Sequence, residues 1–280
     1  YKVGEKVFYD VFSTFSEKYV SPAPFRRIKF KDAILKYGSD KPDLRNPLII
    51  EDISDIMGKS DFAPFKDTVV RCIKVENIEK SNSWYKTMEE YVKGLHGNLG
   101  YIQVKEGMEL KSSLTKFMSD EVKSELIEKM NLHENDALFI VADKNRCARI
   151  MGNLRTKLGN ELDLIDKNRY EFCIINDFPF YEENEETGAI EFSHNPFSMP
   201  KGGLDALNNK NPFEIEAFQY DFVCNGYEMA SGGVRNHSPE ILKKAFELVG
   251  YGEDIVRSKF PSLYEAFKYG APPHAGMAPG

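Results

Sequence analysis

The sequence predicts an α+β fold that carries a smaller α/β module within it. Two continuous apolar runs, at 137–143 and 172–180, are typical of strands buried on both faces. Several other stretches repeat apolar residues at helical spacing. Residues 57–136 differ in pattern from the rest of the chain, because short apolar runs alternate there with helical patterns. This difference indicates a separate module.

The first segment, 1–56, begins with a predicted helix over residues 1–19. Its apolar positions recur at helical spacing with charges between them: Val7, Phe8, Val11, Phe12 and Phe15. A second short helix is expected from Phe30 to Tyr37 and ends at Gly38. The loop that follows, 38–45, is dense in charged residues and turn formers and is too polar for a core.

The module at 57–136 is expected to alternate strands and helices. Strands are predicted at 68–73 and 100–104, and helices at 84–95 and 119–130. In the third segment, 137–280, the two buried strands flank a basic amphipathic helix, and 188–194 alternate as in a strand. Two helices are expected to close the chain, the first with Ser238 as its N-cap and Pro239 in its first turn.

Composition excludes several classes of protein. The 280 residues carry a net charge of −7, which argues against a broad basic face for nucleic acid. No apolar run approaches the roughly 18 residues of a membrane helix, and the N-terminus has no signal-peptide pattern. The missing initiator methionine suggests a trimmed chain. Four scattered cysteines without a CxxC pair predict reduced core thiols rather than a zinc site. No P-loop, GxGxxG or GxSxG motif is present.

The stretch 216–235 predicts a hairpin that turns at Asn225-Gly226. With those two residues in the turn, Val223 pairs with Glu228, and Asp221 lies on the same face of the sheet, opposite Ala230. Asp221 and Glu228 are then diagonal neighbours, roughly 7–8 Å apart. Magnesium that carries phosphate oxygens is a natural occupant between two such carboxylates.

Arg235 follows on the same run. Strict alternation places it on the face opposite Glu228, but a bulge at the paired glycines 232 and 233 would return it to the same face. An ordinary surface hairpin with solvated acids is the alternative, and the pattern alone leaves it open. His194, at a strand end, and His274, in a loop, are each compatible with a purely structural role.

Together these segments resemble the bacterial-type aspartyl-tRNA synthetase family over nearly the whole chain. The resemblance is carried, in order, by 37–45 (YGSDKPDLR), 177–180 (DFPF), 194–197 (HNPF), 220–235 and 269–280 (YGAPPHAGMAPG). Asn195 stands where many members have a second histidine, and 230–232 (Ala-Ser-Gly) where they often have three glycines.

The resemblance implies a class II synthetase antiparallel sheet flanked by helices, with 57–136 as the insertion domain of bacterial members. It implies that Asp221 and Glu228 hold ATP and Mg²⁺, and that Arg235 pairs with the side-chain carboxylate of the substrate. It further implies that His194 belongs to the aspartate site and that Gly280 begins the ATP-binding element of motif 3.

The implied function is ATP-dependent activation of L-aspartate and its transfer to tRNA(Asp), and in some members also to tRNA(Asn). The implied enzyme is cytoplasmic and homodimeric and has no membrane segment. Motif 2, the motif 3 arginine and the anticodon-binding domain lie outside this sequence, so the 280-residue piece alone is expected to be inactive. A non-catalytic module that binds tRNA or protein is the alternative function.

Overall fold

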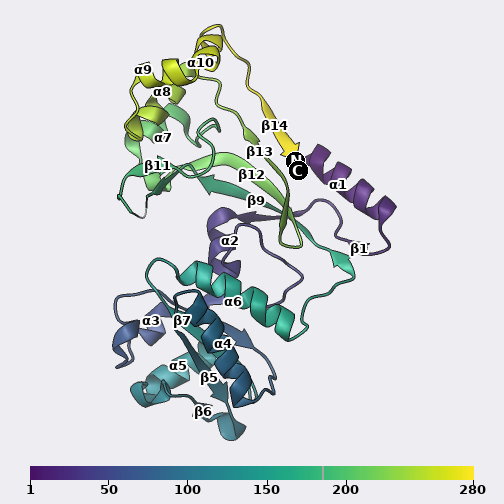
Figure 1. Ribbon diagram of the computed structural model, residues 1–280, viewed down its shortest axis with the longest axis vertical. Coiled ribbons are helices and arrows are strands. Elements are labelled where there is room, and N and C mark those ends of the chain that lie inside the picture. Colours follow the sequence, from purple (N-terminus) through teal and green to yellow (C-terminus); the bar gives the residue numbers. More distant parts are fainter. Residues whose placement is uncertain (185) are drawn as a thin grey trace. The chain divides into compact units, whose positions relative to one another are not determined.

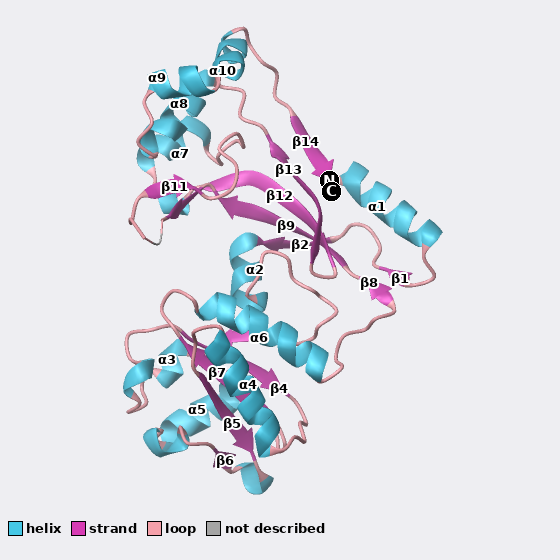
Figure 2. Ribbon diagram, viewed as in Figure 1, coloured by secondary structure: helices cyan, strands magenta, loops and turns pink. Residues whose placement is uncertain are grey.

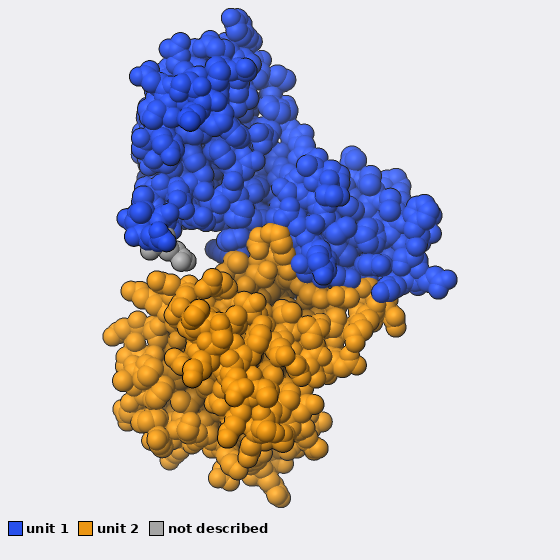
Figure 3. All heavy atoms as spheres, viewed as in Figure 1, with its two compact units in different colours: residues 1–31, 170–280 blue, residues 32–169 orange. Residues whose placement is uncertain are grey.

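The computed structural model describes residues 1–184 and 186–280, which form two compact units. The first unit combines residues 1–31 with 170–280, and the second comprises residues 32–169 (Figure 3). Helix α2 (Phe30–Tyr37) has the predicted bounds and begins two residues before the division.

A five-stranded sheet in the order β14-β13-β12-β9-β2 forms the centre of the first unit (Figure 1). Its strands are β2 (Arg26–Lys29), β9 (Phe172–Pro179), β12 (Glu216–Cys224), β13 (Tyr227–Val234) and β14 (Ala275–Pro279). Neighbours are antiparallel except β2 and β9, which run parallel. The sequence predicted neither β2 nor β14.

Helix α1 (Lys2–Phe15) packs on one face of this sheet. Its Phe8 lies against Phe172 and Phe222, with ring centroids 5.9 and 5.4 Å apart. Because paired residues share a face, the side chains of Ile174 and Ala230 lie there as well, in the same apolar cluster. The observed helix is shorter than the predicted helix over 1–19. It ends at Phe15, and Tyr19 belongs to β1 (Tyr19–Val20).

Smaller elements complete the first unit. The hairpin β10 (Tyr181–Glu183) and β11 (Ile190–Phe192) is antiparallel and is followed by α7 (Gly203–Asn209). Three helices, not two, precede β14: α8 (Pro239–Leu248), α9 (Glu253–Lys259) and α10 (Pro261–Lys268). The predicted cap of α8 is confirmed, since the Ser238 hydroxyl accepts a hydrogen bond from the Ile241 amide at 3.3 Å.

The second unit is a sheet between two layers of helices (Figure 2). Its strand order is β3-β4-β7-β5-β6, from β3 (Ile50–Asp52), β4 (Val70–Val75), β7 (Ala137–Ala142), β5 (Leu99–Val104) and β6 (Leu110–Lys111). One face packs on α3 (Ser54–Met57) and α5 (Asp120–Met130), the other on α4 (Asn82–Gly94) and α6 (Cys147–Glu161). All its pairings are antiparallel, although helices alternate with strands along the chain.

Strand β7 explains why this unit is larger than the predicted module 57–136. It is the central strand, hydrogen-bonded to both β4 and β5, and it is buried on both faces as its apolar run predicts. Helix α6 then covers the same sheet with Ile150, Met151 and Leu154. The compact unit therefore extends beyond the module on both sides, while the assignment of 57–136 as the family's insertion stays a prediction.

Short 3₁₀ turns and one further strand complete the chain, at Ala63–Phe65, Glu106–Met108, Thr115–Phe117 and Pro212–Glu214, and β8 (Arg169–Tyr170). No helix among the described residues is both long and apolar enough to cross a membrane. All four cysteines are buried and free, as the sequence predicts.

Candidate functional site

The β12–β13 hairpin turns at Asn225-Gly226, as predicted. Both residues have a positive φ, 52° and 88°, which Asn and Gly tolerate best. The Asn225 side chain also accepts a hydrogen bond from the Glu171 amide at 2.9 Å, which ties the turn to the start of β9. The predicted pairs Cys224–Tyr227 and Val223–Glu228 are both present.

A β-bulge interrupts the hairpin sooner than predicted. The register shifts between Phe222 and Val223, so that Phe222 pairs with Ala230 and Met229 is the extra residue. Ser231, not Ala230, therefore lies opposite Asp221. The bulge is not at the paired glycines, which continue the ladder in register with Tyr220 and Gln219.

The bulge decides which side chains share a face. Asp221 and Val223 lie two apart on β12, so Glu228, the partner of Val223, is on the Asp221 face. Beyond the bulge, Ser231 and Gly233 are on that face too, and alternation continues it to Arg235. Asp221, Glu228 and Arg235 are thus placed on one side of the sheet, opposite the side covered by α1.

These three residues differ in environment. Asp221 is 3% exposed, whereas Glu228 lies on the surface. Arg235 is half-buried, and its guanidinium carbon lies 5.5 Å from the centre of the Phe197 ring. Among the described residues no carboxylate forms an ion pair with Arg235, although a buried or half-buried guanidinium normally has such a partner. Its side chain is therefore available to an acidic ligand.

A hollow of about 370 Å³ lies beside Arg235. Ser231, Gly233 and Gln219 line it from the hairpin, and Gly276 and Ala278 line it from β14, where they pair with Gly233 and Ser231. Because four of these residues are small, Ser231, Gly233, Gly276 and Ala278, the backbone itself forms much of the floor, and a planar ligand can approach it closely. Asn195 and His274 complete the lining together with Arg235, Gly232, Ala275 and Met277.

The segment 195–201 is held against the ends of β12 and β13 by backbone hydrogen bonds. The Met199 amide donates to Val234 at 2.8 Å, and the Phe218 amide donates to Met199 at 2.9 Å. Ser198 forms a bridge with Arg235 itself. This arrangement explains how Asn195 reaches the hollow, a role that sequence reasoning did not assign to it.

Other predicted site residues lie outside the hollow. His194 is exposed and stands edge-on against Phe178 and Phe30, at 5.0 and 6.0 Å between ring centroids. The Gly280 amide donates a hydrogen bond to Met229 at 3.0 Å and extends the pairing of β14 with β13. Asp221 and Glu228 do not line the hollow either.

A charged cluster lies at the start of β12. The Lys201 ammonium contacts Asp177 at 2.5 Å and Glu216 at 2.9 Å, and it also lies over the Phe218 ring. Burial opposes the charge of Lys201, but the hydrogen bonds with both carboxylates outweigh it and raise the pKa of Lys201. The cluster fixes the Lys201 end of the segment 195–201, whose other end carries Asn195.

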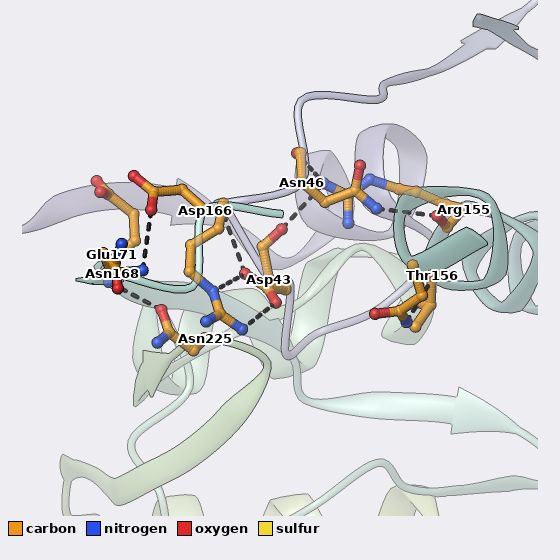
Figure 4. A network of polar contacts seen from close by, with 10 residues as sticks. Asp43, Asn46, Arg155, Thr156, Asp166, Asn168, Glu171 and Asn225 are labelled. Atoms are coloured by element: carbon orange, nitrogen blue, oxygen red, sulfur yellow. Dashed lines mark hydrogen bonds and ion pairs between the residues drawn. The ribbon is translucent and has the colours of Figure 1, made fainter. Parts of the chain in front are cut away.

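In the second unit, the charged loop 38–45 is organised by one buried arginine of α6 (Figure 4). Arg155, 2% exposed, donates hydrogen bonds to the carbonyl oxygens of Leu48, Asn46 and Asp43 at 2.6, 2.7 and 3.0 Å. The Asn46 amide group returns a hydrogen bond to the Arg155 carbonyl oxygen at 2.9 Å. Burial lowers the pKa of Arg155 to about 10. The loop is therefore a fixed part of this unit.

The donor groups of the site determine which metal ion it could hold. Among the described residues, no group of three or more His, Cys, Asp or Glu side chains could hold a metal ion by itself. Asp221 and Glu228 provide two carboxylates on one face. Mg²⁺ is usually held by one or two carboxylates and completes its shell with phosphate oxygens and water, so this donor set fits Mg²⁺ bound together with a nucleotide.

The family model for class II tRNA synthetases (D, K and N) matches residues 1–280. The chain belongs to this family of class II tRNA synthetases. An aspartate–tRNA(Asp/Asn) ligase from Rickettsia canadensis is 47% identical over 288 residues, which cover 99% of this chain and 48% of that protein. One from Rickettsia bellii is 48% identical over 288 residues, with the same coverage.

The chain thus spans about half the length of the curated relatives it matches. Among solved structures, the aspartyl-tRNA synthetase from Entamoeba histolytica matches 76% of this chain and 38% of its own, with 18% identity and a TM-score of 0.29.

Proposed function

We propose that this chain is the part of an aspartate–tRNA ligase that contributes the floor of the catalytic site. The observation that carries the proposal is Arg235, a guanidinium that lines the hollow and has no ion-pair partner among the described residues. A guanidinium fork meets a carboxylate bidentately, whereas the NH₂ group of an asparagine side chain would face it donor to donor. Aspartate is therefore the expected substrate.

The proposed chemistry joins two anions. The α-carboxylate of aspartate attacks the α-phosphate of ATP and pyrophosphate leaves, which gives aspartyl-adenylate. A hydroxyl group of the 3′-terminal ribose of tRNA(Asp) then attacks the aspartyl carbonyl carbon, and AMP leaves. Asp221 and Glu228 would hold Mg²⁺, which supplies positive charge to the phosphates when bound. Arg235 holds the side-chain carboxylate and so orients the α-carboxylate for attack. The glycine-rich floor of β13 and β14 admits the planar base.

The remaining assignments follow from the same proposal. His194 lies one residue from Asn195, and we assign both to the aspartate end of the site. Gly280 is assigned to the ATP end through its pairing next to Met229. The complete enzyme is expected to be a cytoplasmic homodimer. Charging of tRNA(Asn) as well would match the two Rickettsia relatives, which are aspartate–tRNA(Asp/Asn) ligases.

Aspartate-dependent exchange of pyrophosphate into ATP tests the proposal. The protein from the complete reading frame that encodes residues 1–280 should catalyse the exchange with aspartate and not with asparagine. Arg235→Leu should lower kcat/KM for aspartate at least about 100-fold, since a charge-assisted bidentate contact is lost. Arg257→Leu, which changes an exposed arginine in α9, is the matched control and should leave kcat/KM unchanged.

Two further results decide the assignment. Glu228→Gln should raise the Mg²⁺ concentration needed for half-maximal exchange, while the exposed Glu240→Gln in α8 should not. The isolated 280-residue chain is expected to show no exchange. Absence of aspartate-dependent exchange by the complete protein would refute the proposed function, and normal exchange by Arg235→Leu would refute the role of Arg235.

A further inference from the structure

Gln219 lies next to Arg235 on the face of the sheet that carries the hollow. It precedes Asp221 by two residues on β12 and pairs with Gly233 of β13, so its side chain shares the Asp221 face. Arg235 is two residues beyond Gly233, where the pairing of β12 with β13 has ended and Arg235 pairs with Ser198 instead, and both Gln219 and Arg235 line the hollow. Gly233 itself has no side chain, and the buried Ser198 hydroxyl lies over it, 3.3 Å from where a Cβ of Gly233 would be.

Gln219 is a buried residue, but its carboxamide is not sealed off from the accessible space of the hollow that it lines. The residue is 7% exposed, and it lines the hollow together with Ser231, Asn195 and Arg235. Buried amide groups are normally hydrogen-bonded within the protein. In the part of the chain that the structure describes, no hydrogen bond joins the Gln219 carboxamide to another residue.

Gln103 shows the usual arrangement for comparison. It is also 7% exposed, on β5 of the second unit, and its side chain lies close enough to the Tyr85 hydroxyl to oppose the rise in the pKa of Tyr85 that burial causes. The Gln219 carboxamide can therefore form its hydrogen bond with a molecule bound in the hollow. A ligand held by Arg235 would lie close enough to be that molecule.

We propose that Gln219 binds the side-chain end of the amino-acid substrate beside Arg235. This inference rests on the proposed function. A side-chain carboxylate held by the guanidinium accepts a hydrogen bond from the Gln219 Nε2 group. The carboxamide can also rotate and let Oε1 accept from an amide substrate, so it adds affinity without selecting for charge. Arg235 supplies the selectivity for aspartate, and neutral Gln219 preserves it.

Gln219→Glu distinguishes this role from a structural one. A carboxylate at position 219 would repel the aspartate side chain, would compete for Arg235, and would accept a hydrogen bond from an asparagine side chain. Gln219→Leu only removes the hydrogen bond. The two variants therefore change affinity in different ways, and a loss of packing would not reproduce the difference.

The probes are the non-hydrolysable sulfamoyl analogues of aspartyl-adenylate and asparaginyl-adenylate, and their binding to the complete protein is measured by calorimetry. Gln219→Leu should weaken both analogues about tenfold and leave their ratio unchanged. Gln219→Glu should weaken the aspartyl analogue at least about tenfold more than the asparaginyl analogue. Gln103→Leu, the matched control, should leave both affinities unchanged, and thermal unfolding verifies that each variant is folded.

The outcomes separate the two proposals. If the unaltered protein binds the aspartyl analogue but Gln219→Glu weakens both analogues equally, or neither, the role of Gln219 is overturned and the proposed function stands. If the unaltered protein binds neither analogue, the proposed function is overturned and the inference falls with it.

Discussion

Gly152, in the middle of α6, offers a test in which packing and helix propensity have opposite signs. In an open helix, Gly→Ala stabilises by about 1 kcal/mol. Here a methyl carbon on Gly152 would lie 2.8 Å from the carbonyl carbon of Gly38 and 3.0 Å from its Cα, and still closer to its oxygen. These distances are far inside the usual carbon–carbon contact of about 3.5–4.0 Å.

The atoms that Gly152→Ala would meet cannot easily move. They are backbone atoms at the end of α2, where Gly38 has φ +68° and its amide is bonded to Ile34. The following loop is held by Arg155. Overpacking of this kind costs about 1–3 kcal/mol. Because the atoms in the way are backbone, the upper end of that range applies, and after subtraction of the propensity gain we expect Gly152→Ala to destabilise the second unit by about 2 kcal/mol.

Urea unfolding followed by tryptophan fluorescence measures this change. Trp84 is the single tryptophan of the chain and packs edge-on against Tyr85 and Phe139, so its emission reports on the second unit. Gly94→Ala at the end of α4 is the matched control, because nothing lies within 4 Å of its added carbon, and it should be neutral or stabilising. A Gly152→Ala protein as stable as the original would refute the close approach of α6 to Gly38.

Three other substitutions test the remaining structure. Arg155→Met should destabilise the second unit by about 3 kcal/mol in the same fluorescence assay, because it strands three backbone carbonyl groups, and a loss below about 1 kcal/mol would contradict this. Lys201 has a raised pKa in the folded state, so its ion pairs with Asp177 and Glu216 contribute fully below the ordinary value of 10.5 and are lost as pH rises through the folded pKa. The difference in urea midpoint between the original protein and Lys201→Met should therefore be largest near about pH 8 and shrink by about pH 11, and a constant difference would count against the ion pairs. Asn225→Ala should lower the free energy of unfolding by about 1–2 kcal/mol in urea unfolding followed by circular dichroism, because alanine tolerates the left-handed backbone poorly and the side-chain hydrogen bond is lost. An unchanged free energy of unfolding would mean that another turn replaces this one.

Local pattern predicted much of the fold. The helix Phe30–Tyr37 has its predicted bounds, and β7 is buried on both faces as its apolar run implies. Strand β14 could not be predicted, because Ala-Gly-Met-Ala-Pro has little strand propensity of its own. It forms by pairing with β13, where Gly276 lies opposite Gly233. Such long-range pairing is invisible to a local pattern.

The candidate site was predicted in part. The turn residues and the pairs next to them are fixed by local chemistry, and these predictions are confirmed for Asn225 and Val223–Glu228. The position of the bulge was wrong, since no local signal marks Met229 as the extra residue. Asn195 was not assigned to the hollow, because its position depends on hydrogen bonds between distant segments.

The extra residue at Met229 makes the length of β13 more important than the identity of that residue. Successive side chains of a strand alternate between the two faces of the sheet. Removing the one residue between Glu228 and Ala230 would therefore move every later side chain of β13 to the opposite face of the sheet. Arg235 would then leave the hollow without having been changed itself. Among related chains, we therefore expect many different amino acids at position 229. We expect the interval of seven residues from Glu228 to Arg235 to be the same in all of them.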